Sequence, residues 1–173
     1  MATRNGRRAV RLVVGLTVCL IAAAVSAQTP NYGVTVVSEK KMDFTTLKTY
    51  VWTNGQPAAL PAVDKQLVAA IERELASLGL KKLTTGKADV DVAYGALRRT
   101  DVDTKSKPDA TGAMKRYEVG SVYVVMFEPG TRNPMLRLRL DKPIEMDAAK
   151  AEATINAAVA ELFTKYPTRR PKK

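Results

Sequence analysis

The chain has 173 residues, of which 46% are hydrophobic and 26% are charged, with no histidine and a single cysteine, Cys19. Without histidine, the chain lacks the commonest general base and the commonest metal ligand of proteins. We therefore expect no metal ion and no cofactor. The sequence identifies no catalytic residue. Whether the chain is an enzyme stays open, and a non-catalytic role is expected.

The N-terminal segment has the organisation of an export signal. Residues 1–11 carry four arginines and no acidic residue, and a continuous apolar run follows from Leu12 to Val25. Small residues then lead to Ala27, where a signal peptidase would cleave. The apolar run is shorter than the roughly 20 residues that a membrane-spanning helix needs. We therefore predict that residues 1–27 are a secretory signal peptide, that no membrane span remains after its removal, and that the protein is periplasmic.

Three other interpretations of this segment fit the residues less well. The signal could be retained as an anchor, although its apolar run is short for that role. Arg7-Arg8 could mark twin-arginine export, but the residues after the pair match that motif poorly. Cys19 could be lipidated and tether the protein to a membrane, but the bulky Val18 precedes it.

The charge is concentrated at the two ends of the chain. The formal net charge is +11, but the signal and residues 168–173 each contribute four basic residues, which leaves +3 for residues 28–167. We predict a single domain over residues 28–167 and a basic, disordered tail over residues 168–173. A nucleic-acid-binding domain usually has a concentrated basic face, so no nucleic acid is expected. The tail could instead contact anionic lipid or polysaccharide.

The first half of the domain predicts two strands and a helix. Val34–Val37 and Thr49–Thr53 are rich in β-branched or aromatic residues, and Asp43 between them is suited to cap a turn. The helix is predicted over Pro61–Leu78, because apolar residues recur there every three or four positions. Gly79 follows the helix where a left-handed residue commonly ends one.

The second half predicts three strands and a final helix. Ala88–Ala96 and Met135–Leu140 alternate between apolar and polar residues, whereas Tyr117–Glu128 has apolar residues on both of its faces. The last two of these strands, Tyr117–Glu128 and Met135–Leu140, form an antiparallel hairpin. The polar segment Arg98–Arg116 is either a long mobile loop or a frayed extension of a hairpin. A helix is predicted from Asp147, a suitable N-cap, to Pro167.

This order of elements indicates an α+β fold. We expect a mainly antiparallel sheet of about five strands, with two amphipathic helices packed on one face. The opposite face would carry charged and aromatic side chains. These are Asp89, Asp91, Tyr123, Phe127, Arg137 and Arg139.

A family resemblance begins at Asp43 and continues through Lys48-Thr49-Tyr50 to Trp52. Together with Ala88–Tyr94, Gly120–Val124 and Tyr166-Pro167, these residues resemble the domain of unknown function 4136 family of exported bacterial proteins, many of them named lipoproteins. The resemblance covers roughly residues 34–167. It implies an envelope location and an α+β sandwich, and it implies no catalytic residues. Many members carry a lipidated cysteine at the mature N-terminus, which this sequence lacks.

The first functional hypothesis is binding through the open sheet face. Tyr123, Phe127, Arg137 and Arg139 would contact an envelope protein or an anionic polymer, since aromatic and arginine side chains are typical of protein contact surfaces. Alternatively, the two arginines pair across strands with Asp89 or Asp91 and have only a structural role. The oligomeric state is not predicted.

The second hypothesis is a carboxylate-dependent hydrolase of an envelope glycan. Asp89 and Asp91 are two residues apart on a predicted strand, which places their carboxylates about 7 Å apart on one face. That separation is close to the range used by glycosidases. A solvated polar strand face would show the same two residues.

Overall fold

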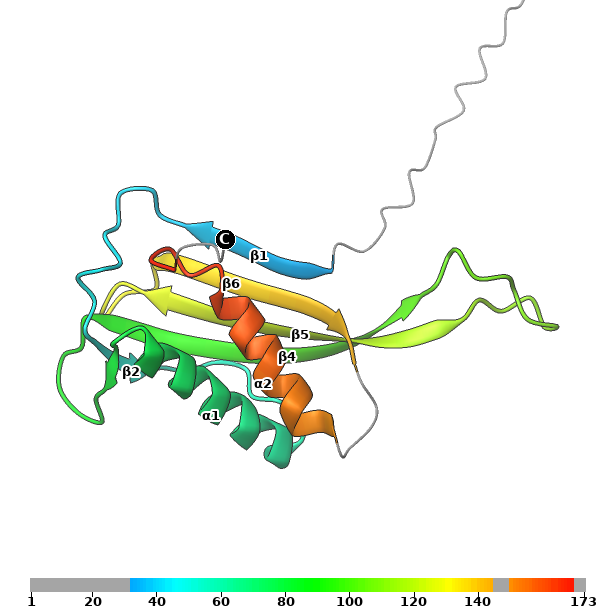
Figure 1. The fold of residues 1–173 in the computed structure, drawn as a ribbon, viewed down its shortest axis with the longest axis horizontal. Helices are drawn as coiled ribbons and strands as arrows, with labels where there is room; N and C mark the ends of the chain where they lie inside the picture. The colour runs from blue at the N-terminus through cyan, green and yellow to red at the C-terminus, as the bar shows by residue number, and fades with distance from the viewer. Residues whose placement is uncertain (1–31, 145–149, 170–173) are drawn as a thin grey trace, which may run out of the picture.

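The computed structural model describes residues 32–144 and 150–169, and these residues form an α+β fold. The elements follow in the order β1 (Gly33–Ser38), β2 (Thr49–Trp52), α1 (Pro61–Ser77), β3 (Lys81–Lys82), β4 (Val90–Val102), β5 (Arg116–Phe127), β6 (Pro134–Pro143) and α2 (Ala151–Phe163). Both helices lie on the same side of one sheet (Figure 1). The predicted fold class is therefore confirmed.

The sheet has six strands in the order β1-β6-β5-β4-β2-β3, one more than expected. The additional strand is β3, which has two residues and was too short to show any alternation. The β1–β6, β6–β5 and β5–β4 pairs are antiparallel, as predicted, whereas β2 runs parallel to both β3 and β4. The parallel pairing follows from topology, because α1 carries the chain back across the sheet between β2 and β4.

Most predicted elements agree with the structure, and the residues predicted to begin a helix, end a helix and cap a turn do so. Helix α1 begins at Pro61, and Gly79 after it has a φ of 85°, a left-handed conformation that glycine adopts without strain. Asp43 caps the turn before β2, since its Oδ1 accepts a hydrogen bond of 2.9 Å from the backbone N–H of Thr45.

Two boundaries differ from the prediction. Strand β4 continues to Val102 and pairs there with Arg116 of β5, so the start of the polar segment is a hairpin extension and not a mobile loop. Backbone hydrogen bonds between the strands, and not burial of apolar side chains, hold these residues in the hairpin. Hydrophobic periodicity therefore does not predict this part of the strand. Helix α2 ends at Phe163, before the predicted Pro167. The predicted cap Asp147 lies outside the described residues.

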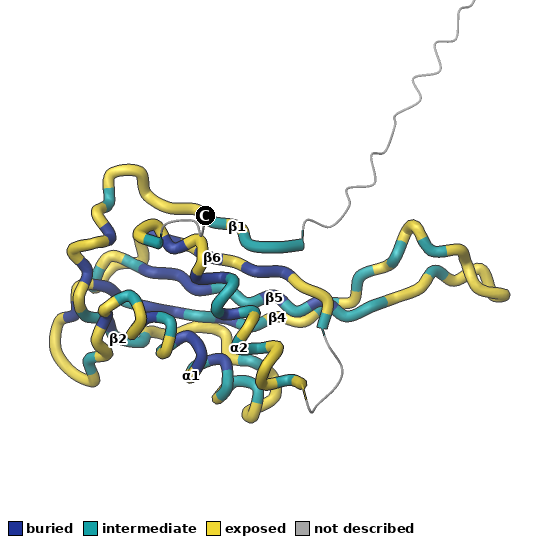
Figure 2. Tube along the Cα trace, viewed as in Figure 1, coloured by how far each residue is buried: buried dark blue, intermediate teal, exposed yellow. Residues whose placement is uncertain are grey.

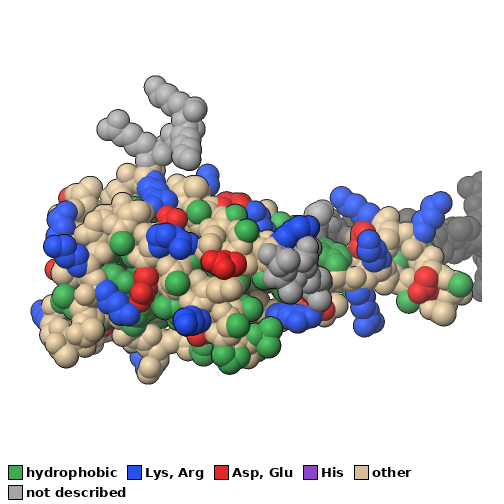
Figure 3. All heavy atoms as spheres, turned by 60° about the horizontal axis from the view of Figure 1, so that its bottom comes forward, with side chains coloured by type: hydrophobic (Ala, Val, Ile, Leu, Met, Phe, Trp, Pro, Cys, Tyr) green, Lys and Arg blue, Asp and Glu red, His purple; other side chains and the backbone are tan. Residues whose placement is uncertain are grey.

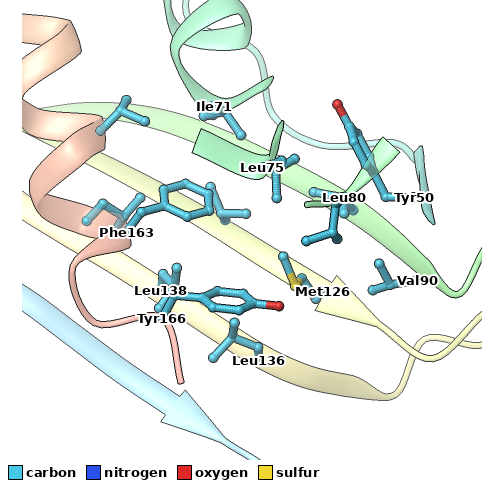
Figure 4. Packing of buried hydrophobic residues seen from close by; sticks show 14 of the residues in the cluster. Tyr50, Ile71, Leu75, Leu80, Val90, Met126, Leu136, Leu138, Phe163 and Tyr166 are labelled. Carbon is cyan, nitrogen blue, oxygen red and sulfur yellow. The ribbon is translucent and has the colours of Figure 1, made fainter. Parts of the chain in front are cut away.

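The core lies between the helices and the sheet. Helix α1 contributes Ile71 and Leu75, and α2 contributes Phe163, each fully buried. Figure 4 shows them against side chains of β2, β4, β5 and β6, together with Tyr166, which follows α2 and is 1% exposed. Burying an aliphatic or aromatic side chain stabilises a fold by about 1.5–3 kcal/mol, so this layer is the main source of stability.

The β4–β5 hairpin projects beyond the part of the sheet that the helices cover (Figure 1). We call residues 98–120 the arm. Figure 2 shows that most buried stretches lie in the body. The arm is exposed or partly buried except at Val119, which is fully buried at its base. Within residues 32–144 and 150–169, no helix is long and apolar enough to cross a lipid bilayer.

Candidate functional site

The face of the sheet opposite the helices, here called the open face, holds all four predicted contact residues. On β5 and β6, residues Val124, Met126 and Leu138 belong to the core cluster. Because side chains alternate along a strand, the residues between them point to the other face. Those residues include Tyr123 and Phe127 of β5 and Arg137 and Arg139 of β6, and Tyr123 lies directly opposite Arg139.

Arg139 is held by an acidic residue of its own strand. Its Nε donates to Oδ2 of Asp141 over 2.8 Å, and its Nη2 donates to Oδ1 over 3.0 Å. Arg99 of β4 donates to the same carboxylate over 2.8 Å, and the hydroxyl of Ser121 donates to it as well. The predicted cross-strand pairing of Arg139 with Asp89 or Asp91 is therefore wrong, because its carboxylate partner is Asp141 of its own strand.

The carboxyl group of Asp141 is ionised in the folded protein. Its side chain is only 10% exposed. Burial by itself opposes ionisation, but the hydrogen bonds from Arg139, Ser121 and Arg99 outweigh burial and hold the pKa far below its usual range. Since two guanidinium groups surround one buried carboxylate, this cluster is a structural ion network and not a proton-transfer site.

The network continues toward the arm. Arg99 also donates to Asp101 over 2.9 Å, and Asp101 accepts a hydrogen bond of 3.1 Å from the hydroxyl of Tyr32. The hydroxyls of Tyr32 and Tyr117 are hydrogen-bonded to each other. Tyr32, which precedes β1, is thus hydrogen-bonded to the base of the arm. In this network the positive charges of two arginines are matched by the negative charges of two aspartates.

Tyr123 lies flat over the neighbouring strand. Its cross-strand partner is Gly95, which lacks the side chain that would otherwise occupy this space. Beside it, Ala93 is 5% exposed and Val125 is 3% exposed. The open face is therefore well packed at its centre, and a long aromatic side chain covers small residues there.

Arg137, the other arginine of the open face, is not part of the ion network around Asp141. Its side chain is exposed, and within the described part of the chain it has no hydrogen-bonded or ion-paired partner. It lines a surface groove of about 490 Å³ at the ends of β1 and β6. The groove is lined by Val37, Ser38, Glu39, Pro134, Met135 and Arg137. Phe127 lies opposite Pro134 at the same end of the sheet.

The two aspartates of the hydrolase hypothesis hold backbone in place. Asp89 precedes β4, and its Oδ2 accepts hydrogen bonds of 2.9 and 2.8 Å from the backbone N–H groups of Lys48 and Thr49. The N–H of Lys48 is the main reason that the pKa of Asp89 is lowered. The carboxylate of Asp91 accepts a hydrogen bond of 3.0 Å from the N–H of Gly130 in the β5–β6 turn. Both carboxylates therefore accept hydrogen bonds that fix neighbouring backbone, which is a structural role.

The remaining surface is mixed in charge. On the side that Figure 3 shows, Lys and Arg side chains are interspersed with Asp and Glu over the body and along the arm. Among residues 32–144 and 150–169, no group of three or more Cys, Asp or Glu side chains could hold a metal ion. Arg169, in the predicted tail, forms an ion pair of 2.7 Å with Glu74 of α1, so the described residues extend past the expected domain boundary.

Sequence reasoning missed Asp141, Arg99 and Ser121. Their residue types were visible, but their meeting depends on the register of three strands. Ser121 pairs with Leu97 on one side and with Asp141 on the other, two positions from Arg99. A register shift between Met126 and Phe127 separates this pairing from the turn, so the bounds of the predicted hairpin do not place Asp141 opposite Ser121.

Comparison with solved structures shows the same fold at low sequence identity. A PDZ domain protein from Parabacteroides distasonis matches with a TM-score of 0.54 and 12% identity, over 80% of this chain and 36% of that one. This chain therefore spans about a third of that protein. PelC from Paraburkholderia phytofirmans, crystallised as a dodecamer, matches with a TM-score of 0.51 and 8% identity, over 78% of this chain and 96% of that one.

Comparison with curated proteins gives no match. A family profile described as a domain of unknown function matches residues 34–168, which is most of the chain. The match includes every described strand and helix except the first residue of β1. The chain therefore belongs to the domain of unknown function 4136 family.

Proposed function

We propose that this protein is a non-catalytic binding module of the bacterial cell envelope, and that it binds a protein partner at the end of the open face around Arg137. One observation carries the proposal: an exposed arginine with no partner among the described residues lines a groove that also contains apolar side chains. An arginine beside apolar and aromatic groups is the composition of energetically important contacts between proteins.

The ligand chemistry follows from the groove. Arg137 can bind a carboxylate through two parallel hydrogen bonds, and Val37 and Met135 supply apolar contacts. Glu39 lines the same groove and would repel a polyanion. This combination favours a protein segment that carries one acidic and one apolar side chain over an anionic polysaccharide.

Arg139 and Tyr123 have supporting roles in this proposal. The guanidinium of Arg139 is occupied by Asp141, and the ring of Tyr123 packs over Gly95. We therefore narrow the predicted contact set to Arg137 and Phe127. The fold of PelC, which its name describes as a dodecamer, supports the idea that such a domain works by contacting other chains.

The proposed location is the periplasm, after removal of residues 1–27. The basic N-terminal residues and the short apolar run that follows them support export.

The test is affinity capture from detergent-solubilised envelope extract with the full chain as bait. Arg137→Glu is compared with Lys65→Glu, the same charge reversal on the exposed side of α1. We expect a protein that stays bound at high salt, is lost with Arg137→Glu and is kept with Lys65→Glu. Equal capture by both variants, or retention of polysaccharide in place of protein, would contradict the proposal.

A further inference from the structure

The two edges of the sheet differ sharply. At one edge, β3 has two residues, Lys81 and Lys82, and both are exposed. Short length and lysine are the usual means by which proteins prevent an edge strand from pairing with another chain. At the other edge, β1 has six residues with the sequence GVTVVS, which contains no charge and no proline. Strand β1 therefore lacks these protective features.

The backbone groups of β1 that face away from the sheet can be assigned. Immediately after β1, the N–H of Glu39 donates to the carbonyl of Met135 over 2.9 Å and so points toward β6. Because N–H and C=O groups alternate sides along a strand, those of Val34, Val36 and Ser38 point outward. Among the described residues, β6 is the only strand that pairs with β1, so these groups form an unpaired row.

Tyr32, the described residue before β1, directs its side chain away from this edge. Gly33 has a φ of 122°, and the side chain of Tyr32 extends over the open face to Asp101 and Tyr117. Figure 1 shows β1 as the outermost strand of the sheet, at the edge away from α1. Among the described residues, the outward N–H and C=O groups of Val34, Val36 and Ser38 have no hydrogen-bond partner.

We propose that β1 pairs antiparallel with β1 of a second copy of this chain, which joins the two sheets into one. The register that pairs all three outward-facing residues places Val36 opposite its own counterpart and Val34 opposite Ser38 of the second copy. Thr35 then lies opposite Val37, whose side chain is 64% exposed in the single chain. All these pairs are uncharged, and most are β-branched, which suits cross-strand packing.

The contrast between the edges also fixes the type of assembly. Pairing of β1 with β3 of another copy would be heterologous and would continue into a filament. The two lysines and the short length of β3 prevent that contact. Pairing of β1 with itself is isologous, so it closes at the dimer. In this arrangement Gly33 of the second copy lies opposite Glu39, and Thr35 of the second copy lies opposite Val37. Both positions are next to the groove.

The first test measures the association state of the full chain across a concentration series by analytical ultracentrifugation. We compare Ser38→Pro, which removes an outward N–H donor, with Ser38→Ala, which keeps it. Proline is tolerated at an edge strand when its missing N–H faces solvent. By symmetry, the proline variant removes two hydrogen bonds from the interface, so we expect the dissociation constant to rise about tenfold or more. The alanine variant should stay close to the original value.

The second test does not depend on the folding of the proline variant. Cys19 is replaced by serine, and Thr35→Cys and Val37→Cys are introduced together. In the proposed register the thiol at position 35 of one copy faces the thiol at position 37 of the second copy. Their separation is within the range that a disulfide spans. We expect a covalent dimer on oxidation of the double variant and little from either single variant.

A chain that stays monomeric at all concentrations would overturn the inference. So would a dimer that neither responds to Ser38→Pro nor forms the cross-link. The inference does not rest on the proposed function, because association state and capture by Arg137 are measured separately.

Discussion

The ring of Tyr123 lies directly across Gly95 of the neighbouring strand. A Cβ placed on Gly95 would stand 2.1 Å from Cζ of Tyr123, far inside van der Waals contact. The two residues are cross-strand partners in the middle of the open face. Glycine normally weakens a strand interior, so its presence here is explained by the aromatic ring that takes its space.

Gly95→Ala should therefore destabilise the protein. The added methyl group displaces the ring of Tyr123, and overpacking of this kind costs about 1–3 kcal/mol. Urea unfolding followed by circular dichroism measures the change in free energy of unfolding. The same substitution in a Tyr123→Ala background should cost little or even stabilise, because the clash is gone and alanine suits a strand better than glycine. An equal cost in both backgrounds would show that the ring is not responsible.

Asp141→Asn should destabilise the protein and change its response to acid. The variant leaves Arg99 and Arg139 without the charge that they share, and loss of one partner of a largely buried ion pair is costly. Since both guanidinium groups are partly exposed, we expect about 2 kcal/mol, less than for a fully buried pair. Asp91→Asn, a surface change, serves as the control and should cost under about 0.5 kcal/mol.

The pH dependence follows from the lowered pKa of Asp141. A carboxyl group with a lower pKa in the folded state stabilises the fold above its unfolded pKa, near 4, and that contribution is lost as the pH falls toward the folded value. We therefore expect the free energy of unfolding to decrease below about pH 4. Unfolding curves collected between neutral and acid pH should show a shallower decrease for Asp141→Asn. An unchanged acid slope would mean that other carboxylates dominate.

Two tyrosine-to-phenylalanine substitutions should have opposite signs. The hydroxyl of Tyr166 is buried, and within the described residues it has no hydrogen-bond partner; burial also raises the pKa of Tyr166 to about 12. Tyr166→Phe removes an unpaired polar atom and should stabilise by about 0.5–1 kcal/mol. The hydroxyl of Tyr94 donates to Asp64 over 2.7 Å, so Tyr94→Phe should destabilise by about 1 kcal/mol.

Both variants can be measured in one series of thermal and urea unfolding experiments. Phenylalanine keeps the ring contacts in each case, so the difference isolates the hydroxyl group. Destabilisation by Tyr166→Phe would imply a hydrogen-bond partner for that hydroxyl, such as an ordered water molecule.

Asp89→Ala should loosen the start of β2. The carboxylate accepts hydrogen bonds from two backbone N–H groups there, and the N–H of Asp89 donates in turn to the hydroxyl oxygen of Thr49 over 3.0 Å. Loss of a comparable cap at a helix end costs about 1 kcal/mol. Hydrogen exchange should become faster at Lys48 and Thr49 and remain unchanged at the far strand β1. Retained protection at these amides would show that the parallel pairing alone holds them.

Local patterns predicted most of the elements because each depends on neighbouring residues. Helix α1 was visible from an apolar stripe that includes Ile71 and Leu75, and β5 was visible from its run of β-branched and aromatic residues around Val124. Strand β3 was missed because two lysines carry no periodicity. The extension of β4 to Val102 was one of two alternatives for the polar segment, and periodicity could not choose between them because charged residues pair there through backbone hydrogen bonds. The four predicted contact residues do share one face, since alternation determines the side on which each points.

The sequence by itself determined the fold class, the family and the placement of Arg137 and Arg139 on one face, because periodicity and short motifs are local properties of the chain. Only the tertiary structure decided that these two arginines differ. Arg139 meets Asp141 and Ser121 through strand register, whereas Arg137, two residues away, lines an open groove. Strand register, and the choice of which strand lies at an edge, result from packing of the whole sheet against α1 and α2. No window of consecutive residues contains that information.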